Sequence, residues 1–436
     1  MKYVIVGMGV AAISAVEAIR SVDNMGSITI IGDDPHGFYS RPGLAYYLNG
    51  ELPEKSLFAV DKKALKKYQA EFLHAKVSRI LPQIQRIELS SGTSLAYDRL
   101  LLAVGASATP INTPGHDLQG VVKIDHLDDT NQIIKLAKRA KEAVVVGGGI
   151  TALELAEGLA ARNVRVHYFL RGDRYWSGVL DKEESQIILK RLQEEGVIIH
   201  THTQAAEILG KRDKVIGVRT SDNEIVKAQL VAYAIGIRPR LELATSAGVQ
   251  TDRGILTSVN MGTSAQNIFA AGDVAQVYDP RTERSILDSL WNPAREQGYV
   301  AGLNMAGKIT AYHKSAPFNV TRLAGLTTTI IGTVGNGQDE DLLGIARGDS
   351  ETWRQLPDSI AAQSGFDTNR LRLMLDEKEI IGAIVMGDQT LSTPIQKLVE
   401  AEADISQIRN QLLAPHAPVA DIIADFWTNW RTENAA

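Results

Sequence analysis

Residues 1–34, MKYVIVGMGVAAISAVEAIRSVDNMGSITIIGDD, decide the fold because they combine a strand, a glycine turn, a helix and a second strand. Residues 4–6 are an uninterrupted apolar run, which is typical of a parallel strand covered on both faces. In the GxGxxA turn that follows, Gly7 permits the bend, Gly9 has no side chain to block a pyrophosphate, and Ala12 keeps helix and strand close. The stretch therefore predicts a dinucleotide-binding unit.

The helix and the second strand complete this unit. A helix predicted over residues 10–22 would direct its first N–H groups, those of Val10, Ala11 and Ala12, and the positive end of its dipole toward the phosphates. The second strand, residues 27–31, ends near Asp33 and Asp34. A carboxylate at that point can accept hydrogen bonds from both hydroxyls of a ribose.

A second copy of this design follows in the middle of the chain. Residues 143–146 form another apolar strand, Gly147–Gly149 form the turn, and a helix that begins at Ile150 and Thr151 is predicted to run to about Arg162. Two such units in one chain form an internal repeat and predict two bound dinucleotides.

The end of the second unit differs from the end of the first. Its second strand, residues 164–169, is followed by Leu170 where the ribose-binding acid would stand, and then by Arg171 and Arg174. No carboxylate would repel a 2′-phosphate there, and two guanidinium groups could bind it. This pattern favours NADPH, with NADH as the alternative.

Composition limits the class of protein. The chain has 436 residues, 44% of them hydrophobic, enough for two to four domains. Lys and Arg total 46 against 51 Asp and Glu, a net charge of −5 that argues against a nucleic-acid surface. No apolar run approaches the roughly 18 residues of a membrane helix. We expect a core strand rather than a removable signal at the N-terminus, and therefore a cytoplasmic protein.

Cysteine is absent, which restricts the chemistry further. The absence excludes a redox-active disulfide, a catalytic thiolate and an iron–sulfur cluster held by Cys ligands of this chain. Redox chemistry would therefore take place on an organic cofactor or on a partner, and we expect no metal site.

Loops that could line the two sites follow several predicted strands. A Pro- and Gly-rich aromatic loop, residues 35–50, contains Arg41 and could contact rings and phosphates beside a nucleotide site, but its composition alone favours a solvated Arg among packed tyrosines. A basic helical pattern covers residues 55–72, and short strands are predicted over 77–100. Three further buried strands end near positions that could reach a cofactor, namely Ala103, Val104 and Gly105; Gly236; and Gly272 and Asp273.

The sequence pattern changes in the last part of the chain. A helix is expected over residues 289–307, with Asn292 as its N-cap and Pro293 at its first position. From about residue 312, β-type runs precede helical patterns, which indicates another domain. Its final segment carries Phe426, Trp427 and Trp430 at helical spacing, as expected of a helix packed on its own domain. A partner surface or a membrane surface is the alternative.

These motifs together resemble the two-dinucleotide flavoproteins, in particular the ferredoxin and rubredoxin reductases and the flavin half of NADH-dependent nitrite reductases. The resemblance rests on GMGVAA, GDDPHGFYSRP, LLLAVGASATP, GGGITALELA and FAAGDVAQ, in the family's order. It implies an α/β fold with two Rossmann-like three-layer dinucleotide-binding domains and a C-terminal α+β domain. The expected bounds are residues 1–110 and 235–311 for FAD, 111–234 for NAD(P), and 312–436 for the C-terminal domain.

The resemblance also implies roles in FAD binding. Gly7, Gly9 and Ala12 would hold the pyrophosphate and Asp33 the adenosine ribose, while Arg41, followed by Pro42, would reach the phosphates. The backbone of Val77 would face the adenine, Asp273 would bind the ribitol or the pyrophosphate, and the helix after Trp291 would point its N-terminus at the pyrimidine end of the flavin.

On the nicotinamide side, Gly147–Gly149 would hold the second pyrophosphate, Glu154 resembles the family's acid near the nicotinamide, and Trp291 resembles a tryptophan beside the flavin. One departure concerns a family Lys that pairs with the acid at position 154, because Tyr46 stands where that Lys would. Three environments stay open for Glu154: solvent, a hydrogen bond to Tyr46, or burial that raises its pKa.

Two further departures exclude reactions. Without Cys, the chain lacks the thiol of the disulfide, CoA-disulfide and peroxidase or oxidase branches, and it lacks the sirohaem and iron–sulfur half of a nitrite reductase. We therefore expect an FAD-dependent NAD(P)H oxidoreductase that passes electrons to a small carrier protein such as ferredoxin or rubredoxin. The alternatives are a membrane-surface quinone or dye reductase and a non-enzymatic flavin-switched binding protein. The oligomeric state stays open.

Overall fold

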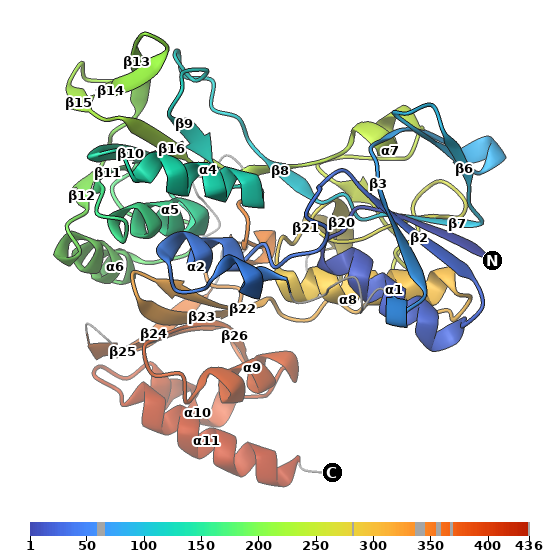
Figure 1. The fold of residues 1–436 in the computed structure, drawn as a ribbon. Helices are drawn as coiled ribbons and strands as arrows, with labels where there is room; N and C mark the ends of the chain where they lie inside the picture. The colour runs from blue at the N-terminus through green and yellow to red at the C-terminus, as the bar shows by residue number, and fades with distance from the viewer. Residues whose placement is uncertain (59–65, 281–282, 336–344, 355–358, 367–368, 435–436) are drawn as a thin grey trace. The chain divides into compact units, whose positions relative to one another are not determined.

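The computed structural model describes residues 1–58, 66–280, 283–335, 345–354, 359–366 and 369–434. The chain forms two compact units (Figure 1). One comprises Met1–Thr109, Asp125–Asn131 and Ile237–Lys314, and the other Pro110–Ile124, Gln132–Gly236 and Ser315–Ala436. Each contains a parallel sheet with helices, so the predicted α/β class is confirmed. The three-domain division expected from the sequence stays a prediction.

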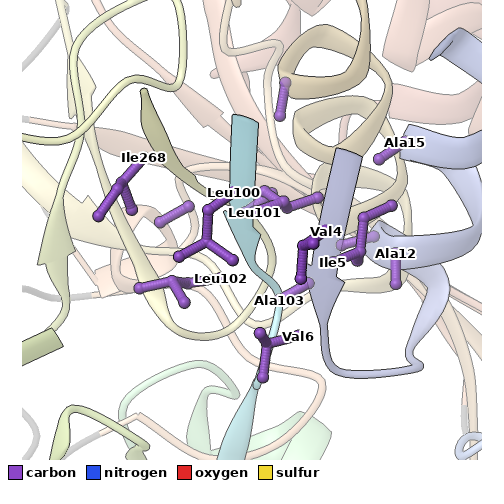
Figure 2. Packing of buried hydrophobic residues seen from close by; sticks show 14 of the residues in the cluster. Val4, Ile5, Val6, Ala12, Ala15, Leu100, Leu101, Leu102, Ala103 and Ile268 are labelled. Carbon is purple, nitrogen blue, oxygen red and sulfur yellow. The ribbon is translucent and has the colours of Figure 1, made fainter. Parts of the chain in front are cut away.

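The first unit is built around β1 (Lys2–Val6), the central strand of a parallel sheet. The strand order is β19-β7-β1-β2-β3, and all four pairings are parallel. The other strands are β2 (Ser27–Gly32), β3 (Ala70–His74), β7 (Arg99–Leu102) and β19 (Ile268–Ala270). Figure 2 shows the side chains of β1, β7 and β19 packed together with Ala12 and Ala15 of the neighbouring helix. Burial on both faces explains why these strands have no alternating polar residues.

Two helices pack closely in this unit, α1 (Val10–Val22) and α8 (Trp291–Met305). A methyl group at Gly298 would clash with the backbone of Ala11, and one at Gly302 would clash with the backbone of Ala15. The later residue of α8 contacts the later residue of α1, so the two helices run parallel. Their N-termini therefore point toward the same edge of the unit.

Two local predictions in this unit are wrong. Helix α8 begins at Trp291 with Leu290 as its N-cap, so Asn292 does not cap it. Of residues 55–72, expected to be helical, 55–57 lie in a short 3-10 helix, η1 (Glu54–Leu57), 59–65 lie outside the described residues, and 66–67 are helical as expected. The prediction is wrong for 70–72, which belong to β3. Strand β3 pairs with β2, and this long-range pairing overrides the helical composition.

Smaller elements complete the first unit. They are α2 (Gly43–Asn49), η2 (Pro82–Ile84) and α7 (Glu242–Ser246), the antiparallel sheet β4 (Val77–Leu81), β5 (Arg86–Leu89) and β6 (Ser94–Ala96), the pair β8 (Ala106–Ala108) and β17 (Ile237–Pro239), and the sheet β18 (Ile255–Leu256), β20 (Ala275–Asp279) and β21 (Arg284–Leu287). Helix α4 (Leu127–Ala137) begins in this unit and ends in the other. Gly92, with a φ of +87°, lies between β5 and β6.

The second unit repeats the plan of the first. Its parallel sheet has the order β12-β11-β10-β16-β9, with β10 (Glu142–Val146) in the place of β1 and α5 (Ile150–Ala160) in the place of α1. The other strands are β9 (Val121–Lys123), β11 (Arg165–Phe169), β12 (Ile198–His200) and β16 (Leu230–Tyr233). Helix α6 (Lys182–Glu194) and the antiparallel strands β13 (Ala205–Lys211), β14 (Lys214–Thr220) and β15 (Ile225–Lys227) accompany it.

The same unit contains an antiparallel sheet from the C-terminal part of the chain, in the order β22-β23-β26-β25-β24. Its elements are β22 (Phe318–Leu323), β23 (Leu326–Gly332), η3 (Glu351–Arg354), β24 (Ile360–Phe366), β25 (Asn369–Leu375), β26 (Ile380–Met386), α9 (Ser392–Glu400), α10 (Ser406–Leu412) and α11 (Val419–Glu433). Phe426 of α11 is buried, and Trp427 and Trp430 pack against the same core, as the sequence predicted. None of the helices in the described part of the chain is long and apolar enough to span a bilayer.

Charged side chains bind α6 to β25 within the second unit. Asp181 and Glu184 form a capping box at the start of α6. The Nε of Arg372 donates to Oε1 of Glu184 at 2.9 Å, and Arg370 donates to Asp181 at 2.8 Å. Arg372 and Glu184 are both buried, so each ion satisfies the other in a place that water does not reach.

Candidate functional site

The first glycine turn has the geometry that a pyrophosphate requires. Gly7 has a φ of +111°, and a methyl group there would clash with the carbonyl oxygen of Ala103. A methyl group at Gly9 would meet nothing within 4 Å. Gly9 is also the N-cap of α1, and having no side chain it leaves the first N–H groups of this helix without a side-chain cap. The turn thus offers an open approach to polarised N–H groups.

The two acids after β2 have different environments. Among the described residues, none hydrogen-bonds to the carboxylate of Asp33, which is exposed at the end of the strand. Asp34 instead accepts hydrogen bonds from the N–H of His36 at 3.0 Å and the hydroxyl of Tyr39 at 2.9 Å. Burial opposes ionisation of Asp34, but hydrogen bonds from His126, His36 and Tyr39 outweigh it and hold its pKa at about 2. Asp34 therefore stabilises the loop through its hydrogen bonds, whereas the carboxylate of Asp33 is accessible to a ligand.

A polar cluster that the sequence did not indicate fixes Arg41. The guanidinium of Arg41 donates to the carbonyl oxygen of Asp125 at 3.1 Å and lies 5.7 Å from the ring centre of Tyr39. His126 lies between carboxylates, with Nδ1 3.4 Å from Asp34 and Nε2 3.6 Å from the buried Asp125. Residues 34–41 and residues 125–126 are more than eighty positions apart in the chain, and no local pattern in the sequence relates them.

Other expected FAD contacts lie at or beside the ends of strands and helices of the same unit. Val77 begins β4, Ala103–Gly105 follow β7, and Pro42 is exposed at the start of α2. Gly272 donates its N–H to Oε1 of Gln297 on α8 at 2.9 Å, and Asp273 follows it, partly buried. A methyl group at Gly272 would lie 3.2 Å from Cβ of Ala11. Gly272 therefore lies close to the start of α1.

The start of α8 presents an aromatic side chain. Trp291 is 37% exposed and its ring lies 6.3 Å from that of the buried Phe38. Asn292 is exposed beside it, and α8 has no side-chain cap. Tyr46, on α2, is also exposed.

These features of the first unit fit the FAD that the sequence predicts. A small residue opens the approach to the N-terminus of α1, an accessible carboxylate follows the second strand, and the uncapped N-terminus of α8 points to the same edge as that of α1. A dinucleotide needs N–H donors for its phosphates and an acceptor for its ribose. The first unit would supply the donors from α1 and the acceptor from Asp33.

The second glycine turn has matching features. Gly147 has a φ of +144°, and a methyl group there would clash with the carbonyl oxygen of Ala234, two residues before Gly236. At Gly148 a methyl group would meet nothing within 4 Å, and Gly149 is the N-cap of α5 without a side-chain cap. The N–H groups of Ile150 and Thr151 start this helix. The turn fits a second pyrophosphate as the first turn does.

Glu154 lies one helical turn after Ile150 on α5. Burial, and then the charge of Glu157, raise the pKa of Glu154 to about 8, and the charge of Arg347 opposes them in part. Of the three environments left open by the sequence, the structure favours burial, which raises the pKa. At neutral pH this carboxyl is mostly protonated and can donate a hydrogen bond.

The residues after β11 carry less free positive charge than the sequence suggests. Leu170, which stands where the ribose-binding acid would, is buried and has no polar side-chain group to bind a ribose. Arg174 donates to Asp173 at 2.9 Å, and this acid offsets its charge. Arg171, Asp173 and Arg174 together have a net charge of +1. Asp173 therefore offsets part of the positive charge that Arg171 and Arg174 would offer to a 2′-phosphate.

The described residues contain no group of three or more His, Asp or Glu side chains that could hold a metal ion. Glu154 belongs to the second unit, whereas Tyr46 and Trp291 belong to the first. The expected approach of these three side chains to one another stays a prediction.

Comparison with known proteins extends this description. A family model described as pyridine nucleotide-disulphide oxidoreductase matches residues 1–298. The ferredoxin–NAD(+) reductase component of the biphenyl dioxygenase system of Paraburkholderia xenovorans is 30% identical over 349 residues, which cover 80% of this chain and 84% of that protein.

A nitrite reductase of Bacillus subtilis is 27% identical over 409 residues, which cover 93% of this chain and 48% of that protein. The chain therefore spans about half the length of this relative. A ferredoxin reductase structure from Rhodopseudomonas palustris superposes with a TM-score of 0.85 at 22% identity, covering 96% of this chain and 99% of that one. At this identity, the likeness shows a common fold.

Proposed function

The chain belongs to the pyridine nucleotide-disulphide oxidoreductase family, and from that premise we propose that it passes a hydride from NAD(P)H to FAD and then electrons to a small carrier protein. Family membership supports the predicted reaction class, an FAD-dependent NAD(P)H oxidoreductase, and both predicted cofactors. The observation that carries the rest of the proposal is the presence of two open glycine turns in a chain without cysteine.

The residues of the chain would bind and orient the two cofactors. FAD, when bound, accepts two electrons as a hydride and can release them singly. The N–H groups at the start of α1 would hold its pyrophosphate, Asp33 its ribose, and the start of α8 would direct a positive dipole end toward its pyrimidine ring. The turn at Gly147–Gly149 would hold the nicotinamide dinucleotide, with Glu154 as a hydrogen-bond donor one turn along α5.

We assign the preference for NADPH to Arg171 and Arg174, which follow β11. The pairing of Arg174 with Asp173 reduces what Arg174 can contribute to binding a 2′-phosphate. Leu170 stands where an acid would repel this phosphate, so the two guanidinium groups would still attract it. This arrangement supports a modest preference for NADPH with NADH still accepted.

We place the exit for electrons at Trp291. Without cysteine, no dithiol can carry electrons away from the flavin, so the acceptor must approach the flavin itself. Trp291 is the exposed aromatic side chain at the helix start that we assign to the flavin. A carrier protein docked over this ring would come close to the cofactor.

The membrane-surface alternative has less support. Trp427 and Trp430 stack on each other at 5.6 Å between ring centres, and both pack against the core of the C-terminal sheet. Rings committed to intramolecular packing are poor anchors for a lipid surface. We therefore propose a carrier protein in preference to a membrane-bound quinone.

Rapid mixing tests the proposal. The flavin-loaded protein is reduced by NADPH or NADH and then mixed with ferredoxin, rubredoxin, a water-soluble quinone or buffer. We expect rapid oxidation by a carrier protein, with a rate that falls as salt rises because such docking is electrostatic. Trp291→Ala should slow this step and spare flavin reduction, whereas Tyr299→Ala, at an exposed position further along α8, should change neither. Faster oxidation by the quinone than by any carrier would contradict the proposal, and a long-lived reduced form with every acceptor would favour a binding role.

A further inference from the structure

One side of α5 carries an acidic pair that the C-terminal sheet covers. Ile150, Glu154 and Glu157 are spaced at about one turn and therefore share a side of the helix. Oε1 of Glu157 accepts the N–H of Gly325, in the turn between β22 and β23, at 3.1 Å. The C-terminal sheet thus holds the far end of this acidic side.

Another C-terminal segment covers the near end. We call residues 345–353 the C-terminal strap. A methyl group at Gly149 would lie 3.4 Å from Cβ of Ala346, and one at Gly348 would lie 3.7 Å from Cδ1 of Ile150. Within the strap, Asp349 is buried and accepts the N–H groups of Ala346 at 3.4 Å and Ser350 at 2.8 Å. The strap is therefore folded against the start of α5.

The strap also has an aromatic anchor beside the second glycine turn. The ring of Trp353 lies edge-on to that of Trp176, with centres 5.9 Å apart, and both rings are buried. The N–H of Trp176 donates to the carbonyl oxygen of Gly148 at 3.2 Å. The strap is thus tied to the glycine turn at Gly148, Gly149 and Ile150.

Arg347 stands between two residues of the strap that contact the start of α5. Ala346 adjoins Gly149 and Gly348 adjoins Ile150, so the backbone of Arg347 lies at the first turn of the helix, on the side that carries Glu154. The positive charge of Arg347 acts on the carboxyl of Glu154, and the negative charge of Glu157 acts against it. A cation from the C-terminal part of the chain is thereby brought to an acid of the dinucleotide-binding part.

We propose that Arg347 is the positioning residue for Glu154, so that the C-terminal domain completes the nicotinamide dinucleotide site. The proposal rests on the proposed function only in assigning that dinucleotide to the second glycine turn. Arg347 would hold the Glu154 carboxyl in one orientation and favour its ionised form. Hydride transfer would then depend on a residue almost two hundred positions away in the sequence.

An infrared titration of the carboxyl groups tests this coupling without any turnover. The C=O band of protonated Glu154 is identified by its loss in Glu154→Gln, and its midpoint is followed between pH 5 and pH 10. Arg347→Ala should raise this midpoint by about one pH unit, because an adjacent opposite charge shifts a carboxyl by one to three units. Arg347→Lys should restore most of the original value.

The control is Arg431→Ala, which removes the same charge from an exposed position on α11. An unchanged midpoint in Arg347→Ala, or an equal shift in Arg431→Ala, would overturn the proposal. If Arg347→Ala fails to fold, Arg347→Gln keeps much of the side chain's length and carries the same comparison. Since neither a dinucleotide nor an acceptor enters this titration, its result is separate from any failure of the proposed electron transfer.

A kinetic measurement then connects the coupling to the reaction. In Arg347→Ala, flavin reduction by NADPH should slow several-fold while the concentration of NADPH for half-saturation changes little, because the carboxyl is misplaced rather than lost. In the Glu154→Gln background, Arg347→Ala should have no further effect. Equal slowing in both backgrounds would show that Arg347 acts without Glu154.

Discussion

Replacing Glu154 with Gln is expected to stabilise the protein at neutral pH, although it alters a residue that we place at the second dinucleotide site. The carboxyl is partly buried on α5 beside Glu157, and desolvation followed by the charge of Glu157 raises its pKa from 4.5 to about 8. A neutral amide of the same shape has no ionised form to desolvate. Glu154→Gln therefore removes a cost that the native side chain imposes on the fold.

The size and the sign follow from proton linkage. Between pH 4.5 and about 8, the folded protein keeps a proton on Glu154 that the unfolded chain releases, so a rise in pH favours unfolding. The stability that the protonated Glu154 carboxyl contributes is fully present below pH 4.5 and is lost as pH rises through about 8. At 1.36 kcal/mol per pKa unit, the loss is about 3 kcal/mol at pH 7. Glu154→Gln should be more stable by that amount.

Chemical denaturation of the flavin-loaded protein at pH 5 and pH 8 measures this difference, provided that unfolding is reversible. The advantage of Glu154→Gln should be small at pH 5 and several kcal/mol at pH 8. Glu433→Gln, at an exposed position on α11, is the matched control and should change stability little at either pH. An advantage of the same size at both pH values, or a loss of stability at pH 8, would refute the assigned environment of Glu154.

Five other substitutions test the remaining assignments. Gly7→Ala should cost more than about 3 kcal/mol and lower the yield of folded protein, because its φ is +111° and the methyl group meets the Ala103 carbonyl. Gly9→Ala should keep the melting temperature and lose FAD on gel filtration, and equal flavin retention in Gly9→Ala and wild type would contradict the open approach. Arg171→Ala together with Arg174→Ala should raise the KM for NADPH at least about tenfold without changing that for NADH, since one charge-assisted hydrogen bond contributes about 1.5 kcal/mol or more. An unchanged ratio of the two KM values in steady-state kinetics would refute the assignment of the 2′-phosphate to these arginines. Asp34→Asn should lower the free energy of unfolding by about 2 kcal/mol at pH 7, because the native carboxylate has a lowered pKa. This loss should disappear as pH falls from about 4 to 2. A loss of stability that does not depend on pH in denaturation curves would exclude the lowered pKa as its cause.

Features encoded by adjacent residues were predictable from the sequence. The apolar run at Val4–Val6, the glycine pattern at Gly7 and Gly9, and the second copy at Gly147–Gly149 each combine strand, turn and helix signals within a few positions. Helix α1 has the predicted bounds, and both sheets have the expected parallel central strand. The family resemblance, which rests on these local motifs, is confirmed by the family model.

Features that depend on distant residues were not predictable. Residues 70–72 looked helical, but their strand pairs with β2 some forty positions earlier in the chain. Nothing near Arg41 indicated Asp125, and nothing near Glu154 indicated Arg347, because such partners meet only after the chain has folded. The expected cap at Asn292 failed for a local reason: an Asn–Pro pair is typical of a helix start, yet the helix here begins earlier, at Trp291.

The buried pairing of α6 with β25 limits how this chain can be recombined with its relatives. A chimera that takes only its C-terminal sheet from another protein would leave Glu184 buried without the guanidinium of Arg372. Removing one partner of a buried ion pair costs about 3 to 5 kcal/mol, a large part of the stability of a typical domain. Exchanges that aim at a new electron acceptor should therefore transfer residues 181–194 together with the sheet, so that helix and strand remain a matched pair.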